Sequence, residues 1–590
     1  MNADPNILQK PAAFLGVETS LTGRRWVGPS VEIDRAAEAM AQTTALPRPI
    51  AQVLARRGVP AAETTAFLAP ALRDLLPDPR SLKDTQVAAQ RLIDAVVKSQ
   101  SIAVFADYDV DGGASAAQLL VWLRHFGLSA TLYVPDRIDE GYGPNDAAMT
   151  QLAADHDLIL CVDCGTLSHA PLAAAAGADV IVLDHHLGGE TLPPALAVVN
   201  PNRQDEDGAL GHLCAAAVVF LTLVEAGRQL REAGKSGPDL MAFLDLVALA
   251  TVADVAPLIG VNRAFVRQGL VVMARRNRPG LVALADAARM DTAPTAYHLG
   301  FVLGPRINAG GRVGQADLGA RLLATDDPHE ADALSQRLDQ LNTERRDIES
   351  AVRAAAFAQA EDRGLDAPLV WAAGKGWHPG VVGIVAARLK ESTGRPAIVI
   401  GLEDGIGKGS GRSVTGIDLG SSIQRLASEG LLVKGGGHKM AAGLTVEEHQ
   451  LEAAMARLSD LLARQGAGDL GPSDLRLDGL LMPGAANLDL LETLEKAGPF
   501  GAAAPGPRFA FSSVKVLQAR RVGDSHLKIS FGDGLGARLD AISFGAFDTA
   551  LGGALQAHGG APFHLAGRLD INTWQGRQSV QLRLEDAAPA

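Results

Sequence analysis

The stretch Ile102-Ala103-Val104-Phe105-Ala106, followed at once by Asp107-Tyr108-Asp109-Val110-Asp111-Gly112, decides the fold. A short apolar run that ends in a polar loop is typical of a buried strand, and a helix rich in alanine and leucine is expected at about 114–126. The pattern recurs with helices at about 145–155 and 169–176, after the runs Thr131–Val134, Leu158–Val162 and Val180–Leu183. Strands that alternate with helices in this way predict an α/β fold with a parallel sheet.

Acidic residues stand where three of these strands end. Asp163 comes directly after Leu158–Val162, and Asp184-His185-His186 comes directly after Val180–Leu183. Sites in parallel sheets form beyond the carboxyl ends of the strands, so these residues and the aspartates of 107–111 are expected to converge. Asp254, at the end of a predicted helix, is expected to join them.

Six carboxylates and two imidazoles in one crevice predict a divalent-metal site. Such a cluster would repel itself unless cations occupied it. Oxygen ligands mixed with imidazole suit Mn²⁺ and Mg²⁺, and this many ligands favour two ions that share a bridging carboxylate. An EF-hand calcium loop starting at Asp107 would need a glutamate where Gln118 stands, which disfavours that alternative.

The rest of the chain predicts several further parts. Residues 212–290 have a mostly helical pattern, and apolar residues every three or four positions predict one long helix after residue 328. A second α/β unit follows, and frequent turns with short alternating runs predict a β-barrel at the end. The predicted divisions are an N-terminal extension at 1–55, a catalytic domain at 56–328, a connecting helix at 329–363, a second α/β domain at 364–466 and a barrel at 470–590.

Bulk composition predicts a multidomain globular protein. The 590 residues are too many for one core, and 47% hydrophobic with 21% charged residues is an ordinary globular balance. The sequence shows no apolar run of membrane-spanning length and no secretory pattern at its start, so a cytoplasmic protein without a membrane partner is expected. Three cysteines fit a reducing compartment: Cys161, Cys164 and Cys214.

The charge distribution points in two directions. The net charge of −13 argues against a nucleic-acid partner, but residues 260–312 carry eight arginines against two aspartates. Either this stretch forms a basic surface that follows phosphates, or its arginines are scattered over solvated helix faces. The arginines are Arg263, Arg267, Arg275, Arg276, Arg278, Arg289, Arg306 and Arg312.

Two suggestive patterns are weaker than they look. Cys161 and Cys164 have the spacing of a zinc or redox pair, but zinc would need a second pair, so both are interpreted as packing residues. The stretch Gly405–Arg412 fits neither a Walker A loop nor a dinucleotide fingerprint. Its glycines either bring the backbone close to a phosphate, with Arg412 and His438 as donors, or form a flexible turn.

Four motifs resemble those of the DHH phosphoesterase superfamily. They are DYDVDG at 107–112, VDCG at 162–165, LDHH at 183–186 and TVADV at 251–255. Further motifs resemble the RecJ branch, the last of them marking a DHHA1-type domain: GPRINAGGRVG at 304–314, WHPGVVGIVAARL at 377–389, GSGRS at 409–413 and GGGHKMAAG at 435–443. The resemblance covers nearly the whole chain. It implies a DHH domain, a connecting helix, a DHHA1 domain and a C-terminal OB-fold.

The resemblance also implies a 5′-to-3′ exonuclease that degrades single-stranded DNA to mononucleotides in DNA repair and recombination, using two Mn²⁺ or Mg²⁺ ions. The implied metal ligands, with Asp163 as the bridge, are Asp109, Asp111, Asp163, His185 and Asp254. Further implied catalytic residues, as ligands or supports of ligands, are Asp107, Asp184 and His186. The implied contacts to DNA phosphates are Arg306, Asn308, Arg312, Ser410, Arg412 and His438.

The resemblance suggests a monomer that works with a single-strand-binding protein and a RecQ-like helicase. An OB-fold binds single strands by base stacking, and the aromatic residues expected to serve here are Phe509, Phe511, Phe531, Phe544 and Trp574. Two departures stand out: Cys164 replaces the usual asparagine of the second motif, and Pro499–Pro505 replaces a more polar turn.

Two alternative functions stay open. A DHH phosphodiesterase for short oligonucleotides or cyclic dinucleotides would share the metal site, but such enzymes are normally shorter and lack the barrel. An inactive DHH scaffold of a replication assembly would have lost metal-site carboxylates, whereas every expected carboxylate is present in this sequence.

Overall fold

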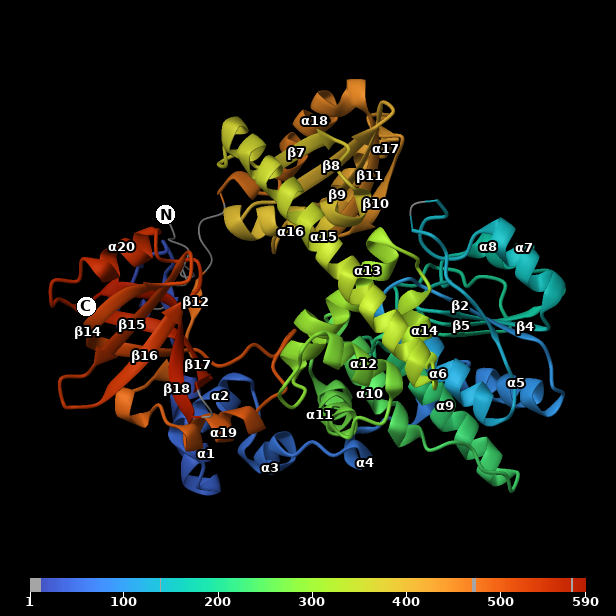
Figure 1. Ribbon diagram of the computed structural model, residues 1–590, viewed down its shortest axis with the longest axis horizontal. Coiled ribbons are helices and arrows are strands. Elements are labelled where there is room, and N and C mark those ends of the chain that lie inside the picture. Colours follow the sequence, from blue (N-terminus) through green and yellow to red (C-terminus); the bar gives the residue numbers. More distant parts are fainter. Residues whose placement is uncertain (1–11, 138, 470–473, 575–576) are drawn as a thin grey trace, which may run out of the picture. The chain divides into compact units, whose positions relative to one another are not determined.

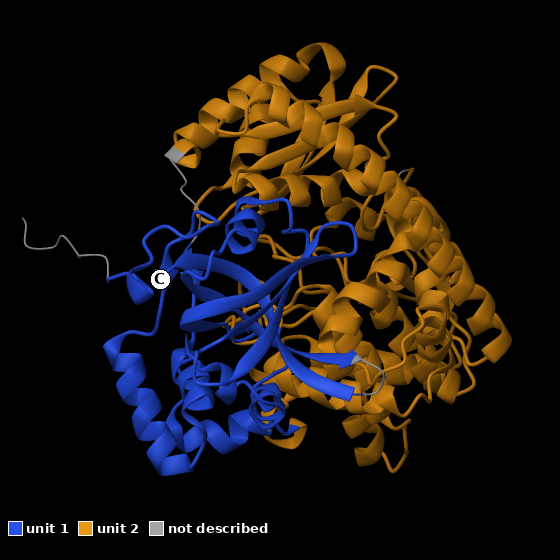
Figure 2. Ribbon diagram, turned by 60° about the vertical axis from the view of Figure 1, so that its left-hand side comes forward, with its two compact units in different colours: residues 1–71, 471–500, 504–590 blue, residues 72–470, 501–503 orange. Residues whose placement is uncertain are grey.

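The computed structural model describes residues 12–137, 139–469, 474–574 and 577–590, which form two compact units (Figures 1 and 2). Unit 1 comprises residues 1–71, 471–500 and 504–590, and unit 2 comprises residues 72–470 and 501–503. Residues 1–11 of the predicted N-terminal extension and residues 470–473, at the start of the predicted barrel segment, lie outside the described residues. None of the described helices is both long and apolar enough to cross a membrane.

Unit 2 contains the predicted parallel sheet, with strand order β3-β2-β4-β5-β6. Its strands are β2 (Ile102–Ala106), β3 (Thr131–Tyr133), β4 (Leu158–Val162), β5 (Asp179–Leu183) and β6 (Ala197–Val199). All residues of β2 and β4 are buried, as expected for a sheet covered on both faces. Figure 1 shows helices on both sides: α5 (Thr85–Val97), α6 (Val110–His125), α7 (Asp146–Asp155) and α8 (His169–Ala174).

A helical region follows the sheet and leads into the long connecting helix. Its helices are α9 (Ala215–Glu232), α10 (Leu244–Ala253), α11 (Gly260–Ala274), α12 (Pro279–Ala287), α13 (Gly304–Val313) and α14 (Leu318–Ala324). The predicted long helix is α15 (Pro328–Arg363), with 36 residues. The side chain of Asp327 caps its start by accepting a hydrogen bond from the backbone N–H of His329, and Gly364 follows its last residue. Both ends of the helix thus have common capping residues.

The second sheet of unit 2 has strand order β10-β11-β9-β8-β7, and only β7 and β8 pair in parallel. Its strands are β7 (Val370–Lys375), β8 (Ala397–Glu403), β9 (Ile406–Arg412), β10 (Lys434–His438) and β11 (Ala441–Glu447). The helices that cover it are α16 (Pro379–Thr393), α17 (Leu419–Ser428) and α18 (Leu451–Ala463).

Most of the glycine-rich stretch at 405–412 is the strand β9, so the interpretation of a flexible turn was wrong, while a phosphate contact through Arg412 and His438 stays a prediction. Gly407, Gly409 and Gly411 face the core of the sheet. A Cβ atom at each of them would lie 2.7 to 2.8 Å from the side chain of Ile400 or Leu419. The glycines therefore make room for large aliphatic residues.

Unit 1 contains the predicted barrel. Its strands are β14 (Phe509–Val522), β15 (His526–Gly532), β16 (Arg538–Ser543), β17 (Pro562–Trp574) and β18 (Arg577–Pro589). They run in the order β14-β15-β16-β18-β17, and β17 pairs back with β14 to close the barrel. The short strand β13 (Gly479–Leu480) adds to β14, and α19 (Leu488–Lys496) and α20 (Ala550–Gln556) accompany the barrel.

Most of the barrel aromatics cannot stack on bases as the sequence suggested. Phe509, Phe511 and Phe531 are fully buried in the core, because strand alternation points them inward. Phe544 is 55% exposed. The side chain of Trp574 lies outside the described part of the chain.

The N-terminal region packs with the barrel in unit 1. Strand β1 (Trp26–Val27) pairs in parallel with β12 (Leu475–Arg476). The buried indole N–H of Trp26 donates a hydrogen bond of 2.9 Å to Asp586, near the end of the chain. Three helices complete this region: α1 (Val31–Thr44), α2 (Arg48–Arg56) and α3 (Thr64–Leu68).

Candidate metal centre

The first acidic loop connects β2 to α6 in a tight turn. The carboxylate of Asp109 accepts hydrogen bonds from the backbone N–H groups of Asp111, at 2.8 Å, and Gly112, at 3.1 Å. Only glycine fits at position 112, because a Cβ atom there would lie 2.4 Å from the carbonyl oxygen of Asp107. The turn thus gathers three carboxylates at the carboxyl end of the sheet.

Asp111 is buried against the first turn of α9. Its carboxylate oxygens accept hydrogen bonds from the backbone N–H groups of Ala215, at 2.7 Å, and Ala216, at 2.8 Å. Such N–H groups at a helix start favour a negative charge. Each oxygen keeps a second lone pair, so Asp111 is held rigidly and can still bind a cation.

Asp163, the predicted bridge, sits in a strained backbone conformation directly after β4. Its φ angle is +60°, which is rare for any residue except glycine and is commonly found at functional sites. Its side chain is almost fully buried, and its Oδ1 atom has no hydrogen-bond donor. A buried carboxylate oxygen without a donor is the environment that a cation would satisfy.

Asp184 organises the loop after β5. One of its oxygens accepts hydrogen bonds from the backbone N–H and the hydroxyl of Thr166, and the other from the backbone N–H groups of His185 and His186. The ring atom Nδ1 of His186 lies 2.8 Å from the same carboxylate. Asp184 is therefore placed to orient both histidines.

His185 lies at the centre of the carboxylate cluster. Its Nε2 atom is 3.3 Å from Asp163, 3.7 Å from Asp111 and 3.8 Å from Asp254. Three sets of ligand atoms lie within 4.8 Å of one another: Asp163, His185 and His186; Asp111, His185 and Asp254; and Asp107, Asp109 and Asp163. Asp163 and His185 each belong to two sets, which suits two neighbouring ions.

Burial and crowding disfavour the ionised form of several carboxylates in this site. Burial, and then the charges of Asp111 and Asp109, raise the pKa of Asp163 well above its usual value. Burial and the same two neighbours raise the pKa of Asp254 to about 8. Asp107 is affected in the same way, and its Oδ1 atom also lacks a hydrogen-bond partner. Divalent cations would relieve this repulsion, and oxygen and imidazole ligands suit Mn²⁺ and Mg²⁺.

Sequence reasoning missed Tyr142, which lies beside the bridge residue. Its hydroxyl is 2.9 Å from the carbonyl oxygen of Asp163 and 3.1 Å from Nδ1 of His186. Tyr142 lies in the loop after β3, between Gly141 and Gly143, and both glycines have positive φ angles. The signal in the sequence that could have identified Tyr142 is its position between two glycines in the loop after a strand.

Two asparagines that sequence reasoning also missed fix the backbone of the histidine loop. Asn200 donates hydrogen bonds of 2.8 Å to the hydroxyl of Thr166 and to the carbonyl oxygen of His186. Asn202 donates to the carbonyl oxygen of His185 at 2.5 Å. Both follow β6, the strand that the sequence did not predict, so their role had no visible context.

A cluster of arginines lies in the same unit. The guanidinium of Arg312 donates a hydrogen bond of 3.1 Å to the carbonyl oxygen of Gly380, at the start of α16. Arg412 and Ser410 lie on β9 next to Gly383 of α16, where a Cβ atom would be 3.3 Å from both side chains.

Arg137, which sequence reasoning missed, completes this arginine cluster. Its guanidinium lies 5.2 Å from the ring centre of Tyr108, in the first acidic loop. Burial, and then the charges of Arg137, Arg345 and Arg412, lower the pKa of Arg312 to about 10. Among the described residues, no carboxylate forms an ion pair with Arg137, Arg312 or Arg412. In the described part of the chain, this arginine cluster (Arg137, Arg312 and Arg412) therefore has no carboxylate in direct contact, and the charge of Asp109 acts on Arg312 from further away.

The other predicted phosphate contacts have different surroundings. Arg306 forms an ion pair of 2.8 Å with Asp339 of α15, and Asn308 accepts a hydrogen bond of 3.1 Å from the backbone N–H of Val110. The side chain of His438 is exposed, and its position on β10 is in register with Ala441 and, one strand further, with Arg412. Arg306 and Asn308 thus have protein partners, whereas His438 shares a sheet face with Arg412.

Three family models match this chain. They are the DHH family, N-terminal domain over residues 101–251, the DHHA1 domain over residues 366–464 and the RecJ OB domain over residues 477–586. The single-stranded-DNA-specific exonuclease RecJ of Dickeya dadantii is 38% identical over 92% of this chain and 96% of that protein. The RecJ of Escherichia coli is 36% identical over 95% of this chain and 98% of that protein. This chain belongs to the RecJ family.

Solved RecJ structures have the same fold. The crystal structure of RecJ in complex with Mn²⁺ from Thermus thermophilus has 32% sequence identity and a TM-score of 0.79, and the match covers 95% of this chain and 79% of that chain. The Mg²⁺ complex of the same RecJ has 30% identity and a TM-score of 0.73, over 96% and 78% of the two chains. Both ions are of the kind that the three ligand sets suit.

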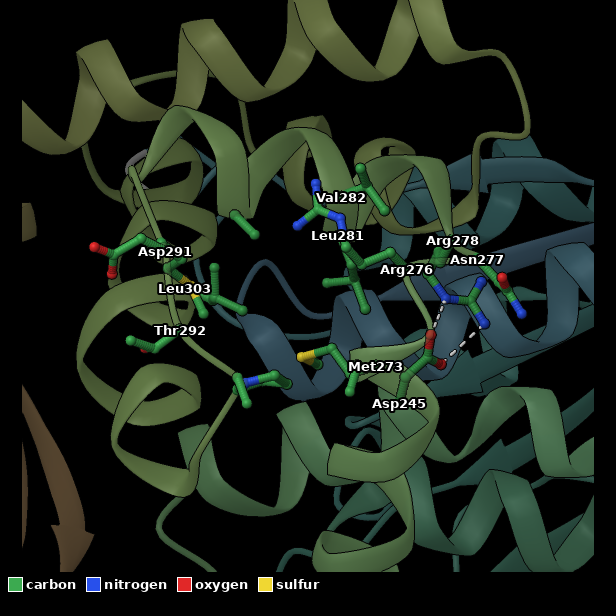
Figure 3. A pocket seen from close by; sticks show the side chains of 15 residues that line it. Asp245, Met273, Arg276, Asn277, Arg278, Leu281, Val282, Asp291, Thr292 and Leu303 are labelled. Carbon is green, nitrogen blue, oxygen red and sulfur yellow. Dashed lines mark hydrogen bonds and ion pairs between the residues drawn. The ribbon is translucent and has the colours of Figure 1, made fainter. Parts of the chain in front are cut away.

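Three of the eight arginines in the stretch 260–312 of this RecJ family member form ion pairs with carboxylates. A cavity of about 310 Å³ lies between α11 and α12. Figure 3 shows some of the side chains that line it, among them Arg276, Leu281 and Met273. Arg278 at its wall pairs with Asp245 at 2.8 Å, and Arg276 pairs with Asp286 at 2.6 Å. Asp245 and Asp339, which lie outside the stretch, each neutralise one of its arginines, so part of the predicted positive charge is balanced within the protein.

The cysteines of the second motif are packing residues, as predicted. Cys161 and Cys164 are fully buried free thiols. Burial raises the pKa of the Cys161 thiol to about 12, which disfavours the thiolate that zinc or redox chemistry would need. Cys164 therefore occupies the asparagine position of the motif as an apolar filler.

Proposed function

We propose that this chain is a metal-dependent exonuclease that degrades single-stranded DNA to mononucleotides from the 5′ end, in DNA repair and recombination. The observation that carries this proposal is a buried carboxylate cluster with unsatisfied oxygens, in the same unit as unpaired arginines. Membership of the RecJ family supports it.

The carboxylate cluster would perform the hydrolysis. Two Mn²⁺ or Mg²⁺ ions bound there would activate a water molecule and stabilise the attacking and leaving oxygens of the phosphodiester. Asp163 and His185 each belong to two of the three ligand sets, so Asp163 would be the carboxylate shared by two ions and His185 could bind either of them. Asp184 holds Nδ1 of His186, so Nε2, which lies 3.3 Å from the hydroxyl of Tyr142, is the ring atom that would donate to a phosphate oxygen. The ligand roles proposed here are for Asp109, Asp111, Asp163, His185 and Asp254, with Asp107 supporting them.

The arginine cluster would supply the direction of digestion. Two cations cannot distinguish a 5′ end from a 3′ end, because neighbouring phosphodiesters look alike to them. A pocket that holds the terminal phosphate one step beyond the scissile bond can make that distinction. Arg412 and Arg312, with the hydroxyl of Ser410, offer charged donors suited to the extra charge of a terminal phosphate.

The remaining predictions complete this proposal. The proposed domains are the catalytic DHH domain at 56–328, the connecting helix at 329–363, the DHHA1 domain at 364–466 and the barrel at 470–590. The barrel would bind the single-stranded DNA. The three free buried cysteines support a reducing cytoplasmic setting. We keep the monomeric state, the single-strand-binding protein and the RecQ-like helicase as predictions from the family.

One assay tests the proposal. Protein supplied with Mn²⁺ is incubated with single-stranded DNA, duplex DNA, RNA and a dinucleotide, each labelled at one end. We expect fast release of mononucleotides from the 5′ end of single-stranded DNA, and slow cleavage of duplex. A preference for the dinucleotide would indicate a phosphodiesterase for short substrates, and no cleavage of any substrate would indicate a scaffold.

A further inference from the structure

Exposed aromatic side chains are scarce in this protein and two of them lie together. Aromatic residues make up 4% of the sequence. In the described part of the chain, the aromatic side chains that are more than half exposed are Tyr142, Tyr297, Phe301 and Phe544. Tyr142 belongs to the metal centre and Phe544 to the barrel. Tyr297 and Phe301 have no role in the function proposed above.

Tyr297 and Phe301 form a stacked pair that faces solvent. Their ring centres are 5.2 Å apart, and the ring planes differ by 25°. Tyr297 is 59% exposed and Phe301 is 70% exposed. Two nearly parallel rings stacked in the open leave one broad apolar face uncovered, which is unfavourable in water unless a ligand covers it.

A rigid turn holds this pair in place. Phe301 lies in the π-helical turn His298–Leu303, a wide turn that is rare and frequent at functional sites. Leu299 and Leu303 of the same turn are fully buried and anchor it. Gly300 packs against α10, since a Cβ atom there would be 3.3 Å from the side chain of Val252. The rings are thus presented outward from a fixed base.

The turn connects the two charged clusters of the protein. It packs on the last turn of α10, and the residue directly after that helix is the metal-centre residue Asp254. It continues directly into α13, which carries Arg312 of the arginine cluster. A strand whose phosphates contact both clusters would therefore pass along the element that carries the two rings.

We propose that Tyr297 and Phe301 form a platform on which a nucleobase of the single strand stacks. This inference rests on the proposed function. The carboxylates, their ions and the arginines all address phosphates, so this unit would otherwise have no described contact to the bases. An aromatic face accepts any base, which suits an enzyme that digests strands of every sequence. It also requires an unpaired base, because a base within a duplex has both faces covered.

The test uses single strands in which one nucleotide at a time lacks its base. Affinities are measured without divalent cations, so that the strands stay intact. For the wild type, we expect one abasic position to weaken binding by about tenfold, the typical effect of losing one stacked base. Phe301→Ala should bind the intact strand about tenfold more weakly, and the abasic effect at that one position should disappear. Phe301→Trp, which keeps an aromatic face, should retain it.

The controls separate this platform from the proposed function. Val271→Ala removes another half-exposed apolar side chain, on α11, and should bind every strand like the wild type. The proposal is overturned if Phe301→Ala still digests single strands in Mn²⁺ and its affinity depends on the position of the missing base in the same way as that of the wild type. A lower melting temperature with unchanged DNA affinity would also overturn it, because the rings would then cover protein. If the wild type neither binds nor digests single strands, the proposed function fails as well.

Discussion

The carboxylate cluster and the arginine cluster are opposite solutions to one problem. Each places like charges close together in a partly buried site, and in each the pKa values move toward the uncharged form. The carboxylates can relieve their repulsion by taking up protons, as the raised pKa of Asp254 indicates. A guanidinium cannot lose its proton under ordinary conditions, so only an anion can relieve the arginines.

This difference indicates what each cluster binds. The carboxylate site is set to exchange protons for divalent cations, and its backbone is held in advance by Asp184, Asn200 and Asn202. The arginines keep their charge at ordinary pH, so we propose that a phosphate of the strand is the anion that they bind. A nuclease needs both: cations to cleave a phosphodiester, and a fixed anion site to choose which phosphodiester is cleaved.

The largest effect is expected for the bridge residue. Asp163→Ala should reduce the rate of hydrolysis by more than about 100-fold. That is the loss expected from removing a residue that only hydrogen-bonds to a metal ligand, and Asp163 is proposed to be a ligand itself. The metal-free fold should survive and its melting temperature should rise at neutral pH, because a crowded carboxylate is removed. Single-strand digestion in Mn²⁺ and a thermal melt measure both effects. Asp155→Ala, an exposed carboxylate on α7, is the control, and substantial turnover by folded Asp163→Ala would contradict the two-metal assignment.

The pH dependence of metal binding sharpens the comparison. Asp254, with its pKa at about 8, holds a proton below that pH, and a metal ion must displace it. Mn²⁺ affinity should therefore fall by up to about tenfold per pH unit below 8, if one proton is released. Calorimetric titration with Mn²⁺ below and above pH 8 measures this. Affinity that does not change with pH would show that the carboxylates are already ionised.

The stability of the metal-free protein should change with pH in the opposite direction to its Mn²⁺ affinity. The raised pKa of Asp254 means that the folded protein binds more protons than the unfolded chain between about pH 4 and pH 8. Its contribution to stability is therefore present at low pH and is lost as the pH rises through about 8. Denaturant melts of the metal-free protein across this range measure it, and saturating Mn²⁺ should flatten the trend.

Tyr142 tests whether the centre depends on its hydrogen bonds. Tyr142→Phe keeps the ring but removes the hydroxyl near Asp163 and His186. Loss of one hydrogen bond of about 1 kcal/mol should lower kcat about fivefold. The KM for a long strand should stay unchanged, because the barrel and the arginines are untouched. A change in KM alone would mean that Tyr142 contacts the strand rather than the centre.

The smallest effect is expected in the barrel. Phe544 is half exposed and lies beside His526 and 5.2 Å from the guanidinium of Arg583. Phe544→Ala should weaken binding of a long strand about threefold, less than the ~1–3 kcal/mol per base of a full stacking contact, because the ring is only half exposed. Cleavage of a short, saturating strand should not change. Leu535→Ala, on the same barrel and 83% exposed, is the control. If both variants lost the same affinity for a long strand, Phe544 would make no specific contact with the DNA.

The parts of the fold that sequence predicted well are local. β2 and β4 have the predicted bounds because each is an unbroken apolar run followed by its own acidic loop. The ligand sets followed, since parallel strands end at one edge of the sheet. Long-range partners had no such signal. The sequence around Gly409 does not indicate that it packs against Ile400, and the sequence around Trp26 does not indicate its hydrogen bond to Asp586, 560 residues away.

The same limit applies to the phosphate contacts. Arg306 and Arg312 looked equivalent in one motif, yet only Arg306 has a carboxylate partner, supplied by the distant helix α15. Arg137 was overlooked because its loop carries more acids than bases, and its neighbour Arg412 belongs to a different sheet. The identity of a residue predicts the chemistry that it can perform. Its availability depends on partners that only the fold brings.

The division of labour between the two clusters is tested most directly by one variant and two substrates. Wild type and Arg412→Ala digest matched single strands that carry either a 5′ phosphate or a 5′ hydroxyl, in saturating Mn²⁺. If the arginine cluster holds the terminal phosphate, Arg412→Ala should lose about 10–100-fold on the phosphorylated strand, as for one charged hydrogen bond of ~1.5–3 kcal/mol, and far less on the hydroxyl strand. Equal losses on both strands would place Arg412 on the general path of the backbone and contradict the account.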